Sequence, residues 1–266
     1  FGQTITWGDW LIAAAPWSIL MSIALYFVMI KMMPPETEEI AGGQETIRIA
    51  LHALGPMTGA EWRLLLLTLT LLAFWATEKV LHPFDTSSTT IAAIALMFTP
   101  GIGVMGWKQA QSKIPWGTIV LFGTGISLGT ALLQTKAAAW LANIIVANLG
   151  LAGASAFVIL ALLSLFLIVV HLGFASATAL ASAMIPIMIS VLQQIAGGPD
   201  AAPLNLVGMT MLLQFVVSFG FILPVNAPQN MVAYGTDTFT VKDFVRTGLV
   251  LTVIGFGLVL LLGATY

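Results

Sequence analysis

Two clusters of small polar and amide residues interrupt an otherwise apolar chain. The first runs over Gly173–Thr178, and the second, Leu223–Asn230, carries Pro224 and Pro228 with Asn226 between them. Proline removes a backbone donor and clashes with the preceding helical turn, so the second cluster cannot continue a regular helix. Hydroxyls, amides and freed helix N-termini attract anions, whereas exposed carbonyl ends attract cations. These residue types predict non-covalent binding of a small ion.

The sequence around the first cluster places it at membrane depth. Between Lys136 and Asp200 the chain has no Asp, Glu, Lys or Arg. In a bilayer, broken helix is tolerated only where protein or a polar cavity supplies hydrogen-bond partners. Secondary transporters build their sites from discontinuous helices near the midplane. Proline kinks and Ser/Thr back-bonding that only shape packing are the other interpretation, but the presence of two breaks favours a binding site.

Composition identifies the class of protein. The chain has 266 residues, of which 59% are hydrophobic and 8% charged, whereas soluble domains carry about 25% charge. We therefore expect an integral, multi-pass membrane protein. The absence of Cys excludes disulfides, thiolate metal sites and Cys nucleophiles, and no basic tract suggests nucleic acid. Residue 1 is Phe and no signal peptide is visible, so we expect a piece of a longer protein.

Apolar segments of roughly 20 residues predict the membrane-spanning helices. The 154–195 region can be read as two full spans or as one re-entrant hairpin, and its uncharged turn at Ala175–Thr178 favours the hairpin. The expected segments are Trp10–Ile30, Leu64–Leu81, Thr89–Trp107, Trp116–Leu133 with a continuation to Leu149, Ala154–Leu172, Ala179–Ile195, Leu204–Leu223 and Phe244–Gly263.

The positions of the basic residues predict the orientation. Counting spans alternately leaves Lys79 and Lys136 on one face, and this asymmetry makes the other face cytoplasmic. That cytoplasmic face carries Lys31, Arg48, Arg63, Lys108, Lys113, Lys242 and Arg246. Residues 33–60 form a predicted cytoplasmic linker, in which the apolar spacing near Arg48 favours a short interfacial helix. A plain solvated loop is the alternative there, and Asp85 is expected to cap the helix that follows it.

Three stretches resemble the divalent anion–sodium symporter family, which carries dicarboxylates and citrate. They are Ile114–Gly125, Ser176–Pro186 and Pro224–Asn230, with smaller matches at Tyr234-Gly235 and Val241–Asp243. The resemblance implies an all-α polytopic membrane protein that is the second of two inverted repeats, with a re-entrant helical hairpin and a broken transmembrane helix. It also implies a homodimer and an N-terminal half of the same transporter as partners.

The resemblance also implies a division of labour along the chain. A moving transport domain is expected from residues 1–32, from the hairpin at 150–199, and from the broken helix and final helix at 200–266. Residues 33–60 form the linking arm, and residues 61–149 supply a dimerising scaffold.

Site residues follow from the same matches. The substrate carboxylate and a sodium ion would lie between the hairpin tip and the broken helix. The implied substrate-binding residues are Ser176, Ala177, Thr178, Asn226, Ala227, Pro228 and Asn230, and the implied sodium ligands are Ala175, Ser176, Ala177 and Asn226. Ala177 stands where the family has Asn. Asn226 stands where the family has a smaller residue, and Gln229 stands where it has Pro. We therefore hypothesise that Asn226 restores the lost amide from across the cavity.

His171 is the only ionisable residue in the charge-free stretch. An ionisable side chain at membrane depth is by default a functional candidate. Protonated His171 could stand in for a coupling cation. The alternative is a neutral imidazole hydrogen-bonded to a helix carbonyl.

The sequence thus predicts a secondary active transporter of small di- or tricarboxylates of the succinate, malate or citrate type in a bacterial inner membrane. It would work by alternating access, either as a sodium-coupled symporter or as a carboxylate exchanger, and no other cofactor is expected. The alternatives are an anion channel and a proton-coupled organic anion carrier. We expect no enzyme, because Ser176 and His171, the only conceivable nucleophile and base, lie five apart on a helix and do not share a face.

Overall fold

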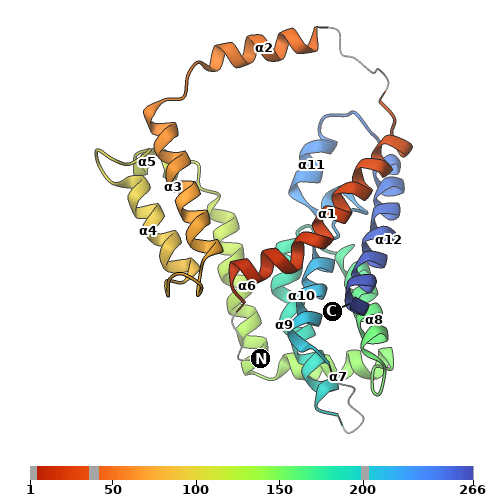
Figure 1. The fold of residues 1–266 in the computed structure, drawn as a ribbon. Helices are drawn as coiled ribbons and strands as arrows, with labels where there is room; N and C mark the ends of the chain where they lie inside the picture. The colour runs from red at the N-terminus through yellow and green to blue at the C-terminus, as the bar shows by residue number, and fades with distance from the viewer. Residues whose placement is uncertain (1–4, 36–41, 199–203, 266) are drawn as a thin grey trace. The chain divides into compact units, whose positions relative to one another are not determined.

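The computed structural model describes residues 5–35, 42–198 and 204–265, and it is built from helices (Figure 1). The predicted all-helical membrane class is confirmed, because α1, α3, α9 and α12 are each long and apolar enough to cross a bilayer. The helices are α1 (Trp7–Met32), α2 (Gly43–Leu54), α3 (Gly59–Ala76), α4 (Thr86–Phe98), α5 (Trp107–Gln111), α6 (Trp116–Gln134), α7 (Ala137–Leu149), α8 (Ala156–His171), α9 (Ala177–Ala196), α10 (Leu206–Val217), the 3-10 turn η1 (Pro224–Asn226), α11 (Pro228–Tyr234) and α12 (Val241–Thr265).

Backbone packing divides the chain into two compact units. The larger contains Pro16–Met33 and Trp116–Tyr266, and the smaller contains Gly2–Ala15 and Pro34–Pro115. The boundary inside α1 falls at Pro16, which has no backbone N–H to donate to the preceding turn. The larger unit thus groups α6 and α7 with the later helices, while the assignment of residues 61–149 to a scaffold and of the other ranges to a transport domain stays a prediction.

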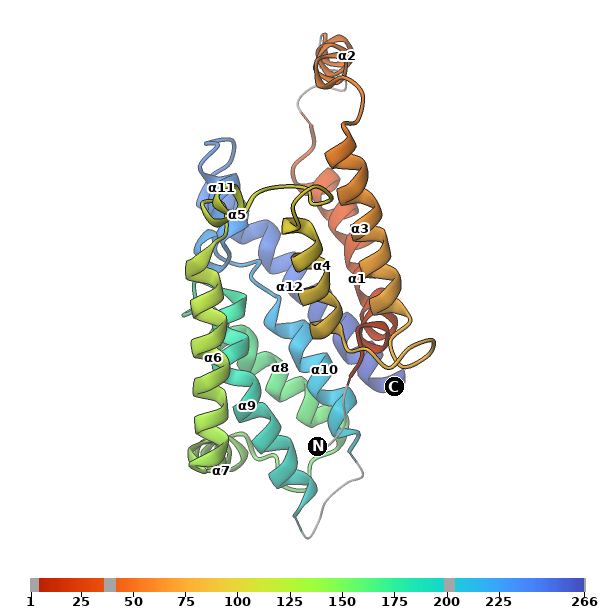
Figure 2. The ribbon, with the colours of Figure 1, turned by 90° about the vertical axis from the view of Figure 1, so that its left-hand side faces the viewer.

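The larger unit is centred on the two helices that flank the first polar cluster. Helix α9 packs against α6, α7 and α10, and α8 packs against α10 and α12, as Figure 2 shows. Many side chains of α8, α9 and α10 are almost completely excluded from solvent. The turn between α8 and α9 therefore adjoins the buried core of the larger unit. The buried side chains include Leu160, Leu163, Leu167, Leu180, Met188, Val191, Leu192, Leu213 and Val216.

Helices α6 and α9 approach each other unusually closely. An ideal Cβ atom built at Gly125 would lie 2.3 Å from Cβ of Ser182, and one at Gly129 would lie 2.8 Å from the Pro186 ring. Only residues without side chains allow this approach. Helix α7 is tied to α9 as well, because the side-chain amide of Gln194 donates to Oδ1 of Asn143.

The continuation predicted from Trp116 to Leu149 is not straight. The chain bends by 77° between Gly123–Gln134 and α7, at Lys136, whose φ of 60° is left-handed. Left-handed backbone ends a helix because its carbonyl no longer follows the ladder. Figures 1 and 2 show α7 running across the end of α6.

Helices α3 and α4 also differ in their bounds from the predicted segments. Helix α4 stops at Phe98 rather than Trp107, because Pro100 and the left-handed Gly101 follow. Helix α3 begins at Gly59 rather than Leu64, because Thr58 and Glu61 form a capping box there. It ends at Ala76 instead of the predicted Leu81.

The smaller unit contains α2, α3 and α4. The predicted helix near Arg48 is present as α2, and none of its residues is buried, while its position on a membrane surface stays a prediction. Residues 36–41 of the predicted linker lie outside the described residues. The cap predicted at Asp85 is confirmed, since Oδ1 accepts from the backbone N–H of Ser88 at 2.9 Å.

Candidate functional site

The predicted hairpin turn lies between α8 and α9. Backbone N–H groups of Leu172, Gly173 and Phe174 donate to carbonyls three residues earlier at 3.0–3.2 Å, which tightens the end of α8 and stops it. Ser176 is extended and caps α9, with Oγ accepting from Ala179 N–H at 3.4 Å. The turn therefore spans residues 172–176, slightly before the predicted Ala175–Thr178.

The second break begins earlier in the chain than its prolines. Helix α10 ends at Val217 rather than at the predicted Leu223, and the chain resumes helical form only in η1 and α11. Pro224 and Pro228 are the first residues of these two short segments, where a missing N–H leaves no bond unmade. The prolines thus start the short helices, and the non-helical stretch is Ser218–Leu223.

Glycine at position 248 holds α12 against this stretch. An ideal Cβ atom at Gly248 would lie 1.8 Å from the Phe221 carbonyl oxygen and 2.6 Å from its carbonyl carbon. The backbone of the break therefore lies directly on the backbone of α12. Such an approach fixes the break without any side chain between the two segments.

Asn226 joins the two breaks. Its Nδ2 atom donates to the His171 carbonyl and to the Phe174 carbonyl, both at 2.9 Å, and its Oδ1 accepts from Leu223 N–H at 3.1 Å. The residue is only 1% exposed. Both amide hydrogens are thus used by the hairpin turn, and the ligand-facing role hypothesised for Asn226 would require these bonds to be exchanged.

The other predicted substrate residues differ in exposure. Ser176, Ala177 and Thr178 are half-buried at the start of α9, and the first backbone N–H groups of a helix have no partner within it. Ala227 is buried and Pro228 is exposed. Asn230 is half-buried, with Nδ2 donating to the Gly220 carbonyl at 2.7 Å. The structure therefore brings Asn226 to the hairpin turn, while Asn230 contacts its own break.

His171 lies behind the hairpin turn. It is 1% exposed, and neither ring nitrogen has a hydrogen-bond partner among residues 5–35, 42–198 and 204–265. A Cβ atom at Gly220 would lie 3.5 Å from the imidazole Cε1 and 3.5 Å from Cβ of Asn226. The backbone carbonyl of Asn226 lies beside the ring without forming a hydrogen bond to it in the described part of the chain.

The residues implied as sodium ligands offer few side-chain oxygens, and their role as ligands stays a prediction. Carriers hold sodium with unwound backbone carbonyls and helix C-terminal ends. Ala175 and Ala177 could contribute only their backbone carbonyls, and the hydroxyl of Ser176 already caps α9. Asn226 directs nitrogen, not oxygen, toward the hairpin carbonyls. The Asn226 amide nitrogen therefore occupies the space between the His171 and Phe174 carbonyls.

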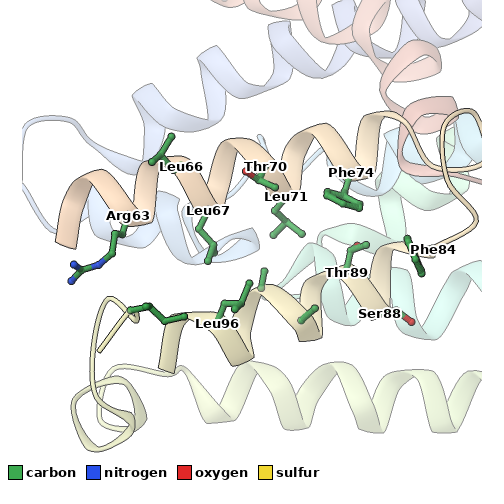
Figure 3. A pocket seen from close by; sticks show the side chains of 13 residues that line it. Arg63, Leu66, Leu67, Thr70, Leu71, Phe74, Phe84, Ser88, Thr89 and Leu96 are labelled. Atoms are coloured by element: carbon green, nitrogen blue, oxygen red, sulfur yellow. The ribbon is translucent and has the colours of Figure 1, made fainter. Parts of the chain in front are cut away.

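Two cavities lie near other parts of the chain. In the larger unit, a cavity of about 630 Å³ is bounded by α1, α11, α12 and the second break, and Ser218, Phe221 and Asn230 line it. In the smaller unit, a groove of about 590 Å³ runs between α3 and α4 from Arg63 to Phe84 (Figure 3). Only Asn230 among the predicted substrate residues lines either of them.

Sequence reasoning missed the residues that let the breaks meet. Gly248 is needed because the Phe221 backbone lies against it, and Gly220 adjoins His171 and Asn226. Glycine is common in membrane helices, where it serves general packing, so its presence gave no specific signal. The run Ser218-Phe219-Gly220 just before a proline could have indicated an earlier break.

The chain is similar in sequence to several bacterial proteins. A "Membrane protein" of Cupriavidus necator is 53% identical over 265 residues, covering 100% of this chain and 51% of its relative. The sodium-dependent dicarboxylate transporter SdcS of Staphylococcus saprophyticus is 24% identical, with coverage of 93% and 48%. The L-tartrate/succinate antiporter of Escherichia coli is 26% identical, with coverage of 97% and 50%. The chain spans about half the length of these relatives.

The family is shown by a match over the whole chain. The model of the sodium:sulfate symporter transmembrane region covers residues 1–266, which confirms the resemblance stated from Ile114–Gly125, Ser176–Pro186 and Pro224–Asn230. A transporter family also confirms that the chain is not an enzyme. The buried, broken and charge-poor helices described above are therefore those of a multi-pass membrane protein that belongs to the sodium:sulfate symporter family.

Proposed function

We propose that this chain is part of a secondary active transporter of small di- or tricarboxylates, of the succinate, malate or citrate type. The substrate carboxylate would bind at the start of α9, where the hydroxyls of Ser176 and Thr178 adjoin free backbone N–H groups. Partial positive charge at a helix N-terminus favours an anion at this place. Two relatives named for dicarboxylates or tartrate and succinate support this substrate class.

The observation that carries the proposal is the junction of the two breaks. Asn226 binds backbone groups of both, at 2.9 Å to His171 and Phe174 and at 3.1 Å to Leu223. Discontinuous helices that meet in this way are typical of transporter substrate sites. A continuous polar lining, which an anion channel would need, is not what these two localised breaks suggest.

The complete carrier would work by alternating access in a bacterial inner membrane. It would combine this chain with the N-terminal half of the same transporter, and two copies would form a homodimer. Sodium-coupled symport and carboxylate exchange are the two coupling modes. Exchange is favoured by the Asn226 amide, which already occupies the His171 and Phe174 carbonyls of the hairpin turn.

Counterflow in proteoliposomes tests this function. The full-length protein, loaded with unlabelled succinate, malate or citrate, should accumulate external labelled dicarboxylate transiently, which a channel cannot do. Ser176→Ala and Thr178→Ala should each raise the KM by about 10- to 150-fold, because a hydrogen bond to a charged group contributes about 1.5–3 kcal/mol net.

Ser155→Ala is the matched control for the Ser176 variant. Ser155 caps α8 with the same geometry, its Oγ accepting from Val158 N–H at 3.4 Å, so both substitutions remove the same local bond. Only the Ser176 variant should alter the KM. Equal effects in the two variants would mean that Ser176 merely caps its helix.

A proton-coupled carrier is the second candidate function. It is favoured by the buried imidazole of His171, whose ring nitrogens have no partner in the described ranges. If transport is proton-coupled, an inward proton gradient should drive succinate uptake by the parent. The same gradient should not drive uptake by His171→Gln. Uptake that follows the gradient equally in both proteins would exclude His171 as the coupling group.

A further inference from the structure

Two carbonyl oxygens at the end of α8 converge on one nitrogen atom. Nδ2 of Asn226 lies 2.9 Å from the His171 carbonyl oxygen and 2.9 Å from the Phe174 carbonyl oxygen. The residues that carry these oxygens and the nitrogen are separated by more than fifty positions in the chain. The hairpin turn therefore closes around a side chain contributed by the other break.

Carbonyls at a helix C-terminus are a natural cation site. They carry the partial negative charge of the helix dipole, and half-helix C-terminal ends coordinate sodium in many secondary transporters. A primary amide can take the same place, because its two N–H hydrogens are two positively polarised donors on one atom. Without such a donor the Phe174 carbonyl would have no partner among the described residues, and an unpaired buried carbonyl is costly.

The orientation of the amide follows from its three contacts. Carbonyl oxygens only accept hydrogen bonds, so the atom that faces them must be nitrogen. Oδ1 then faces Leu223 N–H, at 3.1 Å. The reverse orientation would put oxygen against two oxygens and N–H against N–H. The site is also 1% exposed at Asn226, so water does not compete for it.

We propose that the Asn226 amide substitutes for a coupling cation between the hairpin turn and the second break, so that this half of the carrier binds no sodium there. The inference rests on the proposed function, which it narrows toward exchange of carboxylates. Asn226 is then a positioning residue that holds the turn in the shape in which Ser176 and Thr178 present their hydroxyls. The amide stays at this place because it is part of the chain, whereas a coupling ion binds and dissociates in each transport cycle.

Sodium titration of the purified full-length protein tests the substitution directly. Thermal unfolding is followed in sodium chloride and in choline chloride of equal ionic strength, for the parent and for Asn226→Ala. The variant removes the amide from both carbonyls and leaves the His171 carbonyl only its bond from Phe174 N–H, so it should gain a saturable sodium-specific rise in melting temperature of about 5 °C beyond any response of the parent. Potassium at the same concentration controls for general salt effects.

Asn148→Ala is the matched control. Its Nδ2 also donates to a helix carbonyl, that of Ile144 at 2.7 Å, but on the exposed surface of α7. This variant should respond to sodium as the parent does. Asn226→Asp is the second variant, because at pH 8 its carboxylate would face both carbonyls and need a bridging cation more strongly. Asn226→Asp should be stabilised at sodium concentrations about tenfold lower than those that Asn226→Ala requires.

Each result decides the inference. A weaker sodium response in Asn226→Ala than in the parent would show that Asn226 is a sodium ligand, and an unchanged response would show that it only braces the backbone. If Asn226→Ala does not fold in choline, recovery of folded protein in sodium supports the inference, and failure of the Asp variant to respond to sodium overturns it.

The readout separates this inference from the proposed function. Melting temperatures do not depend on transport, so a parent without succinate counterflow would refute the function alone. In an active parent, counterflow should differ less than about twofold between sodium and choline, whereas Asn226→Ala should be at least about fivefold faster in sodium.

Discussion

Replacing Gly248 by Ala should separate α12 from the broken helix. The added Cβ atom would lie 1.8 Å from the Phe221 carbonyl oxygen, and this oxygen belongs to backbone, which cannot swing away as a flexible side chain can. To restore even a 3.0 Å contact, the two segments must move apart by 3.0 − 1.8 = 1.2 Å. That shift would loosen the contacts of α12 with α8 and α10, since all three pack together.

The expected loss of stability combines two terms. Overpacking of a well-packed site costs about 1–3 kcal/mol, while Gly→Ala in a helix gains up to about 1 kcal/mol of propensity. We therefore expect a net destabilisation of about 1–2 kcal/mol, seen as a fall in apparent melting temperature of about 3–8 °C. The measurement is thermal unfolding of the full-length protein in detergent.

Gly257→Ala is the control on the same helix. No atom lies within 4 Å of its ideal Cβ position, so only the propensity gain remains and the melting temperature should stay equal or rise. If Gly248→Ala is as stable as Gly257→Ala, the close backbone contact does not hold the break, and the account of its position is refuted.

Three further predictions follow from single contacts. His171→Leu should leave the melting temperature unchanged or raise it, because burial of an imidazole without described partners is unfavourable and its removal costs no hydrogen bond; a clear fall in circular-dichroism melts would reveal a partner. Gln194→Leu should destabilise by about 0.5–1 kcal/mol through loss of its bond to Asn143, whereas the same change at the exposed neighbour Gln193 should not. Hydrogen bonds from the Ser88 backbone N–H and hydroxyl lower the pKa of Asp85, so its ionised form stabilises the cap above about pH 4 and this contribution is lost as pH falls through the lowered pKa. The difference in stability between the parent and Asp85→Asn should therefore shrink in acid. A difference that grows in acid would contradict a lowered pKa.

Features set by local chemistry were predictable from the sequence. The apolar runs gave α8, α9 and α12 nearly to their ends, because length and hydropathy decide which segments can span a bilayer. The cap at Asp85 followed from side-chain chemistry alone. The amide and hydroxyl residues of the two breaks were also identified, since few polar residues occur among so many apolar ones.

Features set by contacts between distant segments were not predictable. Helix α10 ends at Val217, and the stretch that follows it packs against Gly248, which lies far along the chain. The use of the Asn226 amide by His171 and Phe174 depends on two turns meeting in space. The bend after α6 depends on one left-handed Lys, a conformation that side-chain type does not specify.

The contact of α6 with α9 limits how related carriers can evolve. Because a Cβ atom at position 125 would lie 2.3 Å from that of Ser182, the two sites share one small volume. A lineage that acquires a larger side chain at either site must shrink the other or let the helices drift apart. We therefore expect these positions to change together across related genes, with the summed size of the pair held nearly constant while each residue varies.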